Sequence, residues 1–313
     1  MLLGSCAGGA RSFDALPNVY NTNPFLGEKL YVDPYSQAAA KSGVANGDER
    51  AALNQIVTTP QADWIGDWTP GLKQTIRRYL FDAGSVDSLR VMVAYNLPNR
   101  DCGQYSKGGV EGPEAYREWI SEFAAGIGRK KAAIILEPDA LGGMTDCLND
   151  ADQEVRMALI QYAVTVFRSL PRTAVYIDAG NANWVEAGEM AGRLKKAGIE
   201  KANGFALNVS NYVDTEKTVA YGEGISDALG GKVPFVVDTS RNGQGEAPNK
   251  AWCNPEGRGL GHIPTTDTGN PRVHAYLWIK RPGESDGACN GGPAAGAWFH
   301  ERALELIRNA RLR

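Results

Sequence analysis

From about residue 89 onward, short apolar runs alternate with longer amphipathic stretches, and this order strongly limits the folds open to the chain. The runs are rich in Val and Ile and lack strict polar alternation, which is typical of strands buried on both faces. They occupy residues 89–94, 132–136, 174–177, 204–209, 233–237 and 274–279. Strands that alternate with helices predict an α/β fold with a parallel sheet and right-handed crossovers. An open doubly wound sheet and a closed barrel both satisfy this order.

Amphipathic helices are predicted between these runs. Pro113 suits the first turn of a helix, and apolar side chains then recur at helical spacing from Tyr116 to Ile127. Further helices are expected to begin near residues 152, 184, 214 and 297. Neither a GxGxxG turn nor a GxxxxGKS/T phosphate loop accompanies the strands, so the usual nucleotide-binding features of an open sheet are missing.

The chain shows no internal repeat or linker. We therefore expect a single domain over residues 23–313, preceded by a tether rich in Gly, Ala and Asn over residues 1–22. The 33 Lys and Arg against 36 Asp and Glu give a net charge of −3, which argues against a nucleic-acid-binding protein, since such proteins need a basic face. No run of about 18 apolar residues occurs, so no segment is expected to span a membrane. We expect a monomer.

Four of the five cysteines are candidates for disulfide bonds. None of the five lies in a CxxC or Cys/His spacing suited to zinc, and the three histidines are scattered, so we expect no structural metal site. Cys102, Cys147, Cys253 and Cys289 allow three pairings. We favour Cys102–Cys147 with Cys253–Cys289, because each of these cysteines lies in a loop just past a predicted strand. Buried free thiols are the alternative.

Cys6 is the cysteine left over. It ends the stretch LGSC at residues 3–6, which resembles the end of a bacterial lipoprotein signal. Five preceding residues are too few to hold a charged region and an apolar core of 7–15 residues. Either the start codon is placed too late and Cys6 carries a lipid anchor, or the likeness is due to chance.

Acidic residues follow most of the predicted strands. They are Asp101, Glu137, Asp139, Asp178, Asp238, Glu284 and Asp286. The carboxyl ends of parallel strands meet on one face of a sheet or barrel, where ligands bind. A single Asp after a strand is more often a helix cap or a turn former. Here, however, acids follow several strands, and the basic residues Arg100, Arg241 and Lys280 lie among them in the sequence. This pattern favours a shared site instead.

Such a cluster, without metal-ligand spacing, suits hydrolysis by paired carboxylates. One acid must stay neutral to protonate a leaving group, and another must stay ionised to orient water. Loop aromatics beside these acids indicate a sugar ligand, because a flat ring packs on sugar C–H groups while acids and amides bind the hydroxyls. They are Trp64, Trp68, Trp184, Trp252, Tyr31, Tyr95 and Tyr212. Trp119, on a helical stripe, and Trp278, inside a predicted strand, are expected in the core.

Eight groups of segments together resemble glycoside hydrolase family six, the inverting cellulases. They are NPF (23–25) with YVDP (31–34), YNLPNRDC (95–102), EPDAL (137–141), YIDAG (176–180), NVSNY (208–212), DTSRNG (238–243), WCNP (252–255) and WIKRPGESDG (278–287). They follow the family's order from about residue 23 to the end of the chain and are most similar to actinobacterial members. The resemblance implies a distorted, seven-stranded (β/α) barrel, TIM-like, with an active-site cleft at the C-terminal ends of the strands, and no cofactor.

The resemblance also implies roles for five residues in catalysis. Asp139 matches the general acid, and Asp101 matches the nearby acid that raises the pKa of Asp139 and helps to activate water. Ser106 and Tyr95 match a water-binding serine and a tyrosine under the distorted sugar. Asp286 matches the proposed base, a role that the family leaves contested.

Further positions carry over as sugar-binding residues. Lys280 and Glu284 would bind hydroxyls, and Trp252 and Trp184 would be stacking platforms. The remaining expected substrate contacts are Tyr31, Trp64, Asp178, Asn181, Asn208, Asn211 and Arg241. Asn181 stands where the family often has His, so sugar contacts there are expected to differ. The family shares the cysteine pairing favoured above, which implies secretion.

The expected activity is that of an endo-β-1,4-glucanase acting on soluble or amorphous β-1,4-glucan. The long loops that form a tunnel in exo-acting members are missing, and no separate cellulose-binding module or linker is evident. A cellobiohydrolase of the same family and a non-catalytic β-glucan-binding protein are the alternatives. A serine hydrolase is a weaker one, since GESDG at residues 283–287 fits GxSxG but lacks the expected strand–helix context.

Overall fold

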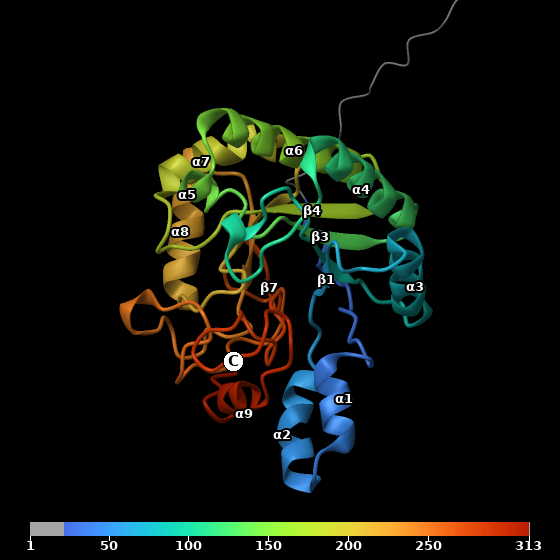
Figure 1. Ribbon diagram of the computed structural model, residues 1–313, viewed down its shortest axis with the longest axis vertical. Coiled ribbons are helices and arrows are strands. Elements are labelled where there is room, and N and C mark those ends of the chain that lie inside the picture. The colour runs from blue at the N-terminus through green and yellow to red at the C-terminus, as the bar shows by residue number, and fades with distance from the viewer. Residues whose placement is uncertain (1–21, 313) are drawn as a thin grey trace, which may run out of the picture.

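Seven strands form one parallel sheet in the order of the sequence (Figure 1). The computed structural model describes residues 22–312, so Cys6 and the expected tether, apart from residue 22, lie outside the described residues. The strands are β1 (Asp63–Ile65), β2 (Val91–Ala94), β3 (Ala132–Leu136), β4 (Thr173–Asp178), β5 (Gly204–Leu207), β6 (Phe235–Asp238) and β7 (Val273–Leu277).

The two ends of the sheet approach each other. Ala62 N donates to Trp278 O (2.9 Å) and Trp64 Nε1 donates to Ile279 O (2.9 Å), which links the segment around β1 to the residues that follow β7. Strand pairing itself is recorded only between consecutive strands. The sheet is therefore a distorted barrel of the TIM-like kind, as the resemblance implies.

Both faces of the strands are buried, which explains the missing polar alternation. In β3, Ile134 and Leu136 pack in the core that the sheet forms with the helices. Ala133 and Ile135 point to the opposite face and pack in the barrel interior with Val93 of β2. Successive side chains alternate between these two faces, as strand geometry requires.

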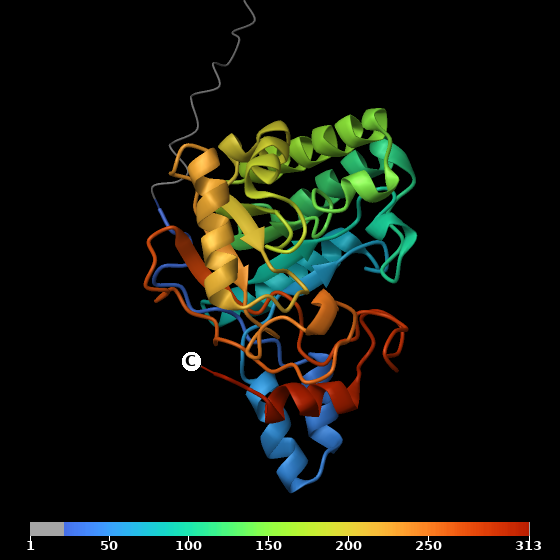
Figure 2. The ribbon, with the colours of Figure 1, turned by 90° about the vertical axis from the view of Figure 1, so that its left-hand side faces the viewer.

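Helices between consecutive strands cover the outside of the barrel (Figure 2). They are α3 (Leu72–Ser85), α4 (Gly112–Ile127), α5 (Met144–Cys147), α6 (Asp150–Arg168), α7 (Ala187–Lys196) and α8 (Thr215–Ala228). The predicted helices near residues 113, 152 and 214 are confirmed as α4, α6 and α8. Asn149 caps α6 by accepting from Asp152 N (3.0 Å), and Asp214 caps α8 by accepting from Lys217 N (2.8 Å). The helix expected around Trp184 begins at Ala187.

Four elements lie before residue 89, where the sequence pattern predicts none. They are β1, α1 (Gln37–Val44), α2 (Gly47–Val57) and α3. α1 and α2 form a hairpin that packs beside the last helix, α9 (His300–Arg308), at the end of the molecule away from α4 and α6 (Figures 1 and 2). The cluster between them includes Leu53, Leu306 and Trp278, so the expected core position of Trp278 is confirmed.

Two disulfides form near the strand ends and confirm the favoured pairing: Cys102–Cys147 joins the loop after β2 to α5, and Cys253–Cys289 joins the loops after β6 and β7. Short 3-10 helices occur in the loops as η2 (Asp101–Gly103), η3 (Ile199–Lys201) and η4 (Pro248–Lys250). No helix within residues 22–312 combines the length and apolar character needed to cross a bilayer.

Candidate active site

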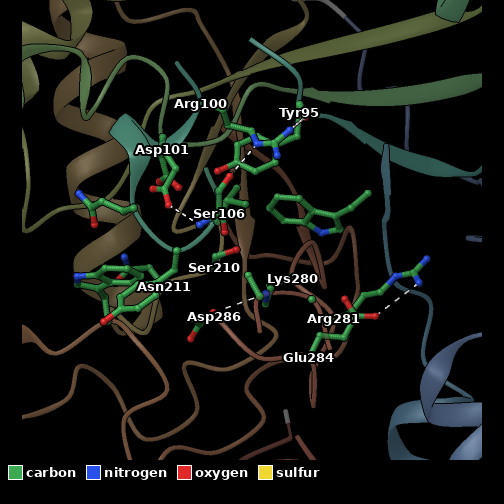
Figure 3. Close-up of a pocket in the computed structure, with 18 of the residues that line it drawn as sticks. Tyr95, Arg100, Asp101, Ser106, Ser210, Asn211, Lys280, Arg281, Glu284 and Asp286 are labelled. Atoms are coloured by element: carbon green, nitrogen blue, oxygen red, sulfur yellow. Dashed lines mark hydrogen bonds and ion pairs between the residues drawn. The ribbon is translucent and has the colours of Figure 1, made fainter. Parts of the chain in front are cut away.

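A cleft of about 880 Å³ opens where the strands end, and loops that follow all seven strands contribute to its wall (Figure 3). Of the predicted site residues, the structure brings twelve to this cleft: Tyr95, Asp101, Ser106, Asp139, Trp64, Asn181, Trp184, Asn211, Trp252, Lys280, Glu284 and Asp286. Figure 3 shows Asp101 and Ser106 above Lys280 and Asp286. The convergence predicted from the order of strands and acids is therefore present.

Asp139 lies in a tight turn, three residues beyond the last residue of β3, Leu136. Its backbone has φ of 67°, a left-handed conformation that costs energy for a non-glycine residue and is common at functional sites. Burial raises the pKa of Asp139 well above its usual range, and Asp178, Asp101 and Asp286 raise it further, in that order. Both burial and the neighbouring carboxyls therefore favour the neutral form of this carboxyl. Asp101 thus raises the pKa of Asp139 in the expected direction, and burial and Asp178 contribute more than Asp101 does.

Asp178 supports this turn from the neighbouring strand. Its Oδ1 accepts hydrogen bonds from Asp139 N (3.0 Å) and Gly180 N (2.9 Å). Its Oδ2 is buried and has no hydrogen-bond partner among the described residues. Burial raises the pKa of Asp178 to about 7. Asp178 thus positions the backbone of Asp139 and lies beneath the cleft wall, where it touches no open space.

Asp101 lies on the loop of residues 95–108, which we call the Asp101 loop. Asp101 Oδ2 accepts from Ser106 N (2.7 Å), and burial raises the pKa of Asp101 although this hydrogen bond opposes the shift. Arg100 donates to Tyr95 O (3.0 Å), Ser106 O (2.8 Å) and Asp67 Oδ1 (2.9 Å), and the Cys102–Cys147 disulfide ties the loop to α5. Asp101 is therefore held firmly at the cleft wall.

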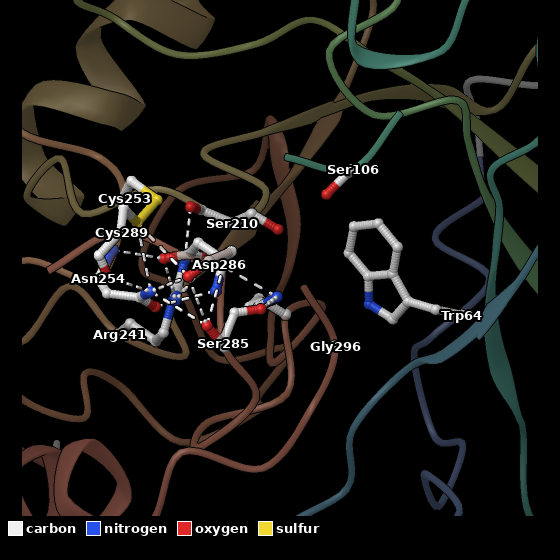
Figure 4. A network of polar contacts seen from close by, with 12 residues as sticks. Trp64, Ser106, Ser210, Arg241, Cys253, Asn254, Ser285, Asp286, Cys289 and Gly296 are labelled. Carbon is white, nitrogen blue, oxygen red and sulfur yellow. Dashed lines mark hydrogen bonds and ion pairs between the residues drawn. A yellow bond between two sulfur atoms is a disulfide. The ribbon is translucent and has the colours of Figure 1, made fainter. Parts of the chain in front are cut away.

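Asp286 lies in the loop after β7 and is surrounded by donors (Figure 4). Its oxygens accept from Tyr212 Oη (3.0 Å), Arg241 Nη1 (2.9 and 3.0 Å) and Asn254 N (3.0 Å), and Lys280 Nζ is 3.6 Å away. Burial alone would raise the pKa of Asp286, but Arg241 and Lys280 outweigh burial and lower it. A carboxylate with these partners and a lowered pKa is a weak proton acceptor.

Lys280 and Glu284 lie on the same loop and face the cleft. Burial lowers the pKa of Lys280, while its ammonium stays close to Asp286 and lies 5.8 Å from the centre of the Trp64 ring. Glu284 Oε1 accepts from Gln37 Nε2 of α1 (2.8 Å). The N-terminal hairpin therefore contributes a side chain to the cleft, which the sequence pattern did not indicate.

Aromatic rings line the cleft and remain partly open to solvent. Trp184 is 39% exposed, Trp252 is 41% exposed, and both lie in loops as expected. The ring of Trp184 packs on Gly142, where an added Cβ would lie 2.7 Å from the indole. The cleft also includes Trp68, which was expected among the loop aromatics that indicate a sugar, and Tyr105, a loop aromatic that was not predicted.

Four predicted substrate contacts do not line the cleft. Besides Asp178, Tyr31 is covered by the guanidinium of Arg90, 4.4 Å from its ring centre. Asn208 is fully buried and donates to two backbone carbonyls. Arg241 is buried against Asp286. The structure therefore places none of these four side chains on the cleft, and Tyr31, Asn208 and Arg241 are held by contacts within the protein.

Ser285, the serine of the GxSxG match, is 1% exposed. Its Oγ donates to Pro293 O (2.9 Å) and Gly287 O (3.0 Å), so it holds the loop together beneath the cleft. It does not reach the open space of the cleft, and the serine-hydrolase alternative is wrong. Among residues 22–312, no group of three or more His, Cys, Asp or Glu side chains could hold a metal ion.

Comparison with known proteins agrees with this geometry. Residues 25–310 match the model for glycosyl hydrolases family 6. The chain is 45% identical to Endoglucanase A of Cellulomonas fimi over 284 residues, which cover 90% of this chain but 61% of that protein. It is 43% identical to Endoglucanase 1 of Streptomyces halstedii over 307 residues, which cover 95% of this chain and 94% of that protein.

A solved structure is similar over nearly its whole length. It is the endoglucanase Cel6 from Mycobacterium tuberculosis in complex with methyl-cellobiosyl-4-deoxy-4-thio-β-D-cellobioside, with a TM-score of 0.88 and 43% identity. The match covers 92% of this chain and 99% of that one. From the family match and these relatives, we conclude that the chain belongs to glycosyl hydrolase family 6.

Proposed function

We propose that this protein is a secreted endo-β-1,4-glucanase that hydrolyses cellulose or soluble β-1,4-glucan with inversion of anomeric configuration, with residues 23–313 as its catalytic domain. The relatives named above are endoglucanases, and one was solved with a cello-oligosaccharide analogue. The half-exposed rings of Trp184 and Trp252 support a cleft that admits the interior of a chain. Two disulfides support secretion, because such bonds persist in oxidising compartments.

The observation that carries the proposal is the state of Asp139. This acid has a raised pKa, lies on the same cleft as Asp101, and faces a wall that includes Trp64 and Lys280. A neutral carboxyl there can donate its proton to the glycosidic oxygen as the C–O bond breaks. A pure binding protein has no need of a carboxyl held neutral, which favours an enzyme over the non-catalytic alternative.

In the proposed reaction, water attacks the anomeric carbon from the face opposite the leaving group. Tyr95 lies under the reacting sugar, and Asp101 with Ser106 orders the attacking water and accepts its proton through hydrogen bonds. The lowered pKa of Asp286 fits an electrostatic role with Arg241 and Lys280 better than that of a direct base. Lys280 and Glu284 bind sugar hydroxyls, and Asn181 does so without titrating.

One assay tests the proposal and separates endo from exo action. Carboxymethylcellulose is incubated with the protein, and the loss of viscosity is plotted against the reducing ends released. Endo attack predicts a steep loss of viscosity for few reducing ends, whereas exo attack predicts the reverse. NMR of the first products from a cello-oligosaccharide should show the α-anomer; the β-anomer appearing first would rule out inversion.

A further inference from the structure

Glu137 is a buried acid beside the site for which the proposed mechanism gives no role. It is 1% exposed and lies at the end of β3, two residues before Asp139. Its carboxylate accepts from Asn96 N (3.0 and 3.1 Å), Leu97 N (3.1 Å) and Tyr116 Oη (2.9 Å). Glu137 therefore joins the turn that carries Asp139 to the start of the Asp101 loop.

Arg156 of α6 joins the same two segments from another side. It is 5% exposed, and its Nη2 donates to Pro98 O (3.1 Å) and Asn99 O (2.9 Å) of the Asp101 loop. Its Nη1 donates to Ala140 O (3.4 Å), directly after Asp139. We call Glu137 and Arg156 the brace, and residues 137–140 the acid turn.

The brace consists of two buried ionisable side chains that bind mainly backbone groups, and burial raises the pKa of Glu137 to about 7. Burying a charge is costly unless it is paired and hydrogen-bonded, so the contacts of Glu137 and Arg156 are the condition for keeping these side chains in the interior. The backbone that they hold is strained, since Glu137, Asp139 and Asp101 have φ of 52°, 67° and 56°. Strain of this kind persists only where the surroundings fix the conformation.

We propose that Glu137 and Arg156 are positioning residues that set the place of Asp139 relative to Asp101. The inference rests on the proposed function, because it takes Asp139 as the acid and Asp101 as the residue that orders water. Neither brace residue lies on the main cleft. Their effect on the reaction passes through the backbone of the acid turn and not through contact with the sugar.

Loss of the brace should displace the acid turn more than the Asp101 loop. The loop keeps the Cys102–Cys147 disulfide and the hydrogen bonds of Arg100. The acid turn keeps mainly the hydrogen bond from Asp139 N to Asp178 and its own backbone bonds. The step that uses Asp139 should therefore suffer, while the step that uses water ordered by Asp101 should be largely spared.

The test compares two substrates in a series of variants at position 137. Hydrolysis of carboxymethylcellulose needs a proton donor, whereas 2,4-dinitrophenyl β-cellobioside has a leaving group that needs none. Glu137→Met keeps the length of the side chain but removes its acceptors. We expect a loss in kcat of about 30- to 100-fold on the cellulose and of about threefold or less on the dinitrophenyl substrate, as for a misplacement of about 1 Å.

Glu137→Gln should rescue the activity, because its oxygen can accept from Asn96 N and Leu97 N while its amide faces the Tyr116 hydroxyl. We expect kcat on carboxymethylcellulose within about fivefold of the original protein, since the acceptor stays in place. Equal losses on the two substrates for Glu137→Met would overturn the proposal. A Gln variant as impaired as the Met variant would overturn it as well.

Arg156→Met tests the other half of the brace from a different element, so that the proposal does not depend on the folding of one variant. It should show the same dependence on the leaving group. Arg168→Met is the matched control: Arg168 is also on α6 and donates to two backbone carbonyls, Thr173 O and Lys201 O, but these lie away from the cleft. The control should lose stability without any difference between the substrates.

Failure of the proposed function would give a different result. In that case the original protein would release no reducing ends from carboxymethylcellulose, or Asp139→Asn would lower both activities alike. If Asp139→Asn shows the leaving-group dependence and the brace variants do not, Asp139 is the acid and the brace does not position it.

Discussion

Two groups of buried acids lie at the ends of the strands, and their pKa values are shifted in opposite directions although both groups are buried. On the side of β3 and β4, Asp139 and Asp178 have raised pKa values, because burial is reinforced by neighbouring carboxyls. On the side of β7, Asp286 has a lowered pKa, because Arg241 and Lys280 outweigh the same burial.

The comparison shows that burial alone does not decide protonation. Desolvation is the largest single influence on both Asp139 and Asp286, yet the two shifts have opposite signs. The difference comes from which charges lie within a few ångströms. One cleft can therefore hold a neutral acid and an ionised carboxylate at the same pH, as an inverting hydrolase requires.

The largest expected effect comes from removing the proton of Asp139. Asp139→Asn should lower kcat on carboxymethylcellulose by about 10²–10⁴-fold, the range for general acid catalysis. It should change the rate on 2,4-dinitrophenyl β-cellobioside far less, because that leaving group departs without a proton. Steady-state kinetics on both substrates provide the measurement. If Asp139→Asn left the cellulose activity intact, the raised pKa of Asp139 would have no role in catalysis.

The second prediction concerns Asp286 and removes Arg241, the cation that pairs with it. Arg241→Met should leave Lys280 as the remaining cation beside Asp286 and lower the free energy of unfolding by about 3–5 kcal/mol, as for a broken buried ion pair. Denaturant unfolding at pH 7 provides the measurement. Arg272→Met is the control, since Arg272 pairs with the exposed Asp227 on the surface and should cost less than about 1 kcal/mol. Similar costs for the two variants would contradict the assigned difference in burial.

The two sides should also respond to pH with opposite signs. Burial raises the pKa of Asp178 to about 7 in the folded protein, above its unfolded value near 3.8. The stability that the protonated carboxyl contributes to the fold is therefore fully present below pH 3.8 and is lost as the pH rises toward 7. Over that window the original protein should lose about 1–3 kcal/mol of stability relative to Asp178→Asn. Unfolding free energies measured from pH 4 to pH 7 check this.

Asp286 provides the counterpart of that measurement. The pKa of Asp286 is lower in the folded protein than its unfolded value of 3.8. The stability that its carboxylate contributes to the fold is therefore present above pH 3.8 and is lost as the pH falls through the folded pKa. The original protein should therefore lose stability relative to Asp286→Asn only at the acid end. The same pH trend for the Asp178 and Asp286 variants would break the comparison.

The smallest effects are expected from the stacking platforms on the two sides. Trp252→Ala should raise KM by about 3- to 10-fold with little change in kcat, the scale of one aromatic contact. Trp184→Ala should raise KM similarly but also lower kcat, because the Trp184 ring packs on Gly142 just after the acid turn. Kinetics on cellopentaose would separate the two, and an unchanged kcat for Trp184→Ala would show that this packing does not support Asp139.

Regions with strong periodicity could be predicted from the sequence. The fully apolar run of β3 and the helical stripe of α4 were found because both bury their apolar residues in the main core. β1 was missed because three residues with one Asp form no apolar run. In α3 a signal was present, since Leu72, Ile76 and Leu80 recur every four residues and are buried.

The sequence alone also indicated that acids gather at the site, since they follow strands and parallel strands end on one face. It did not show that Glu137, Asp178 and Asp238 stay off the cleft. It could not place Tyr31 or Asn208, whose partners Arg90 and Asp238 come from other elements. The role of Gln37 in the cleft was hidden for the same reason, because α1 reaches the loop after β7 across most of the chain.

Local order along the chain therefore predicted six of the seven strands, favoured the cysteine pairing that the structure shows, and supplied the set of candidate acids. The tertiary structure alone decided which of these acids has a raised pKa and which a lowered one. Arg241 and Lys280 meet Asp286 from the ends of different strands, whereas Asp139 meets Asp178 and Asp101. Electrostatic interaction depends on distance through space, and sequence spacing does not fix that distance.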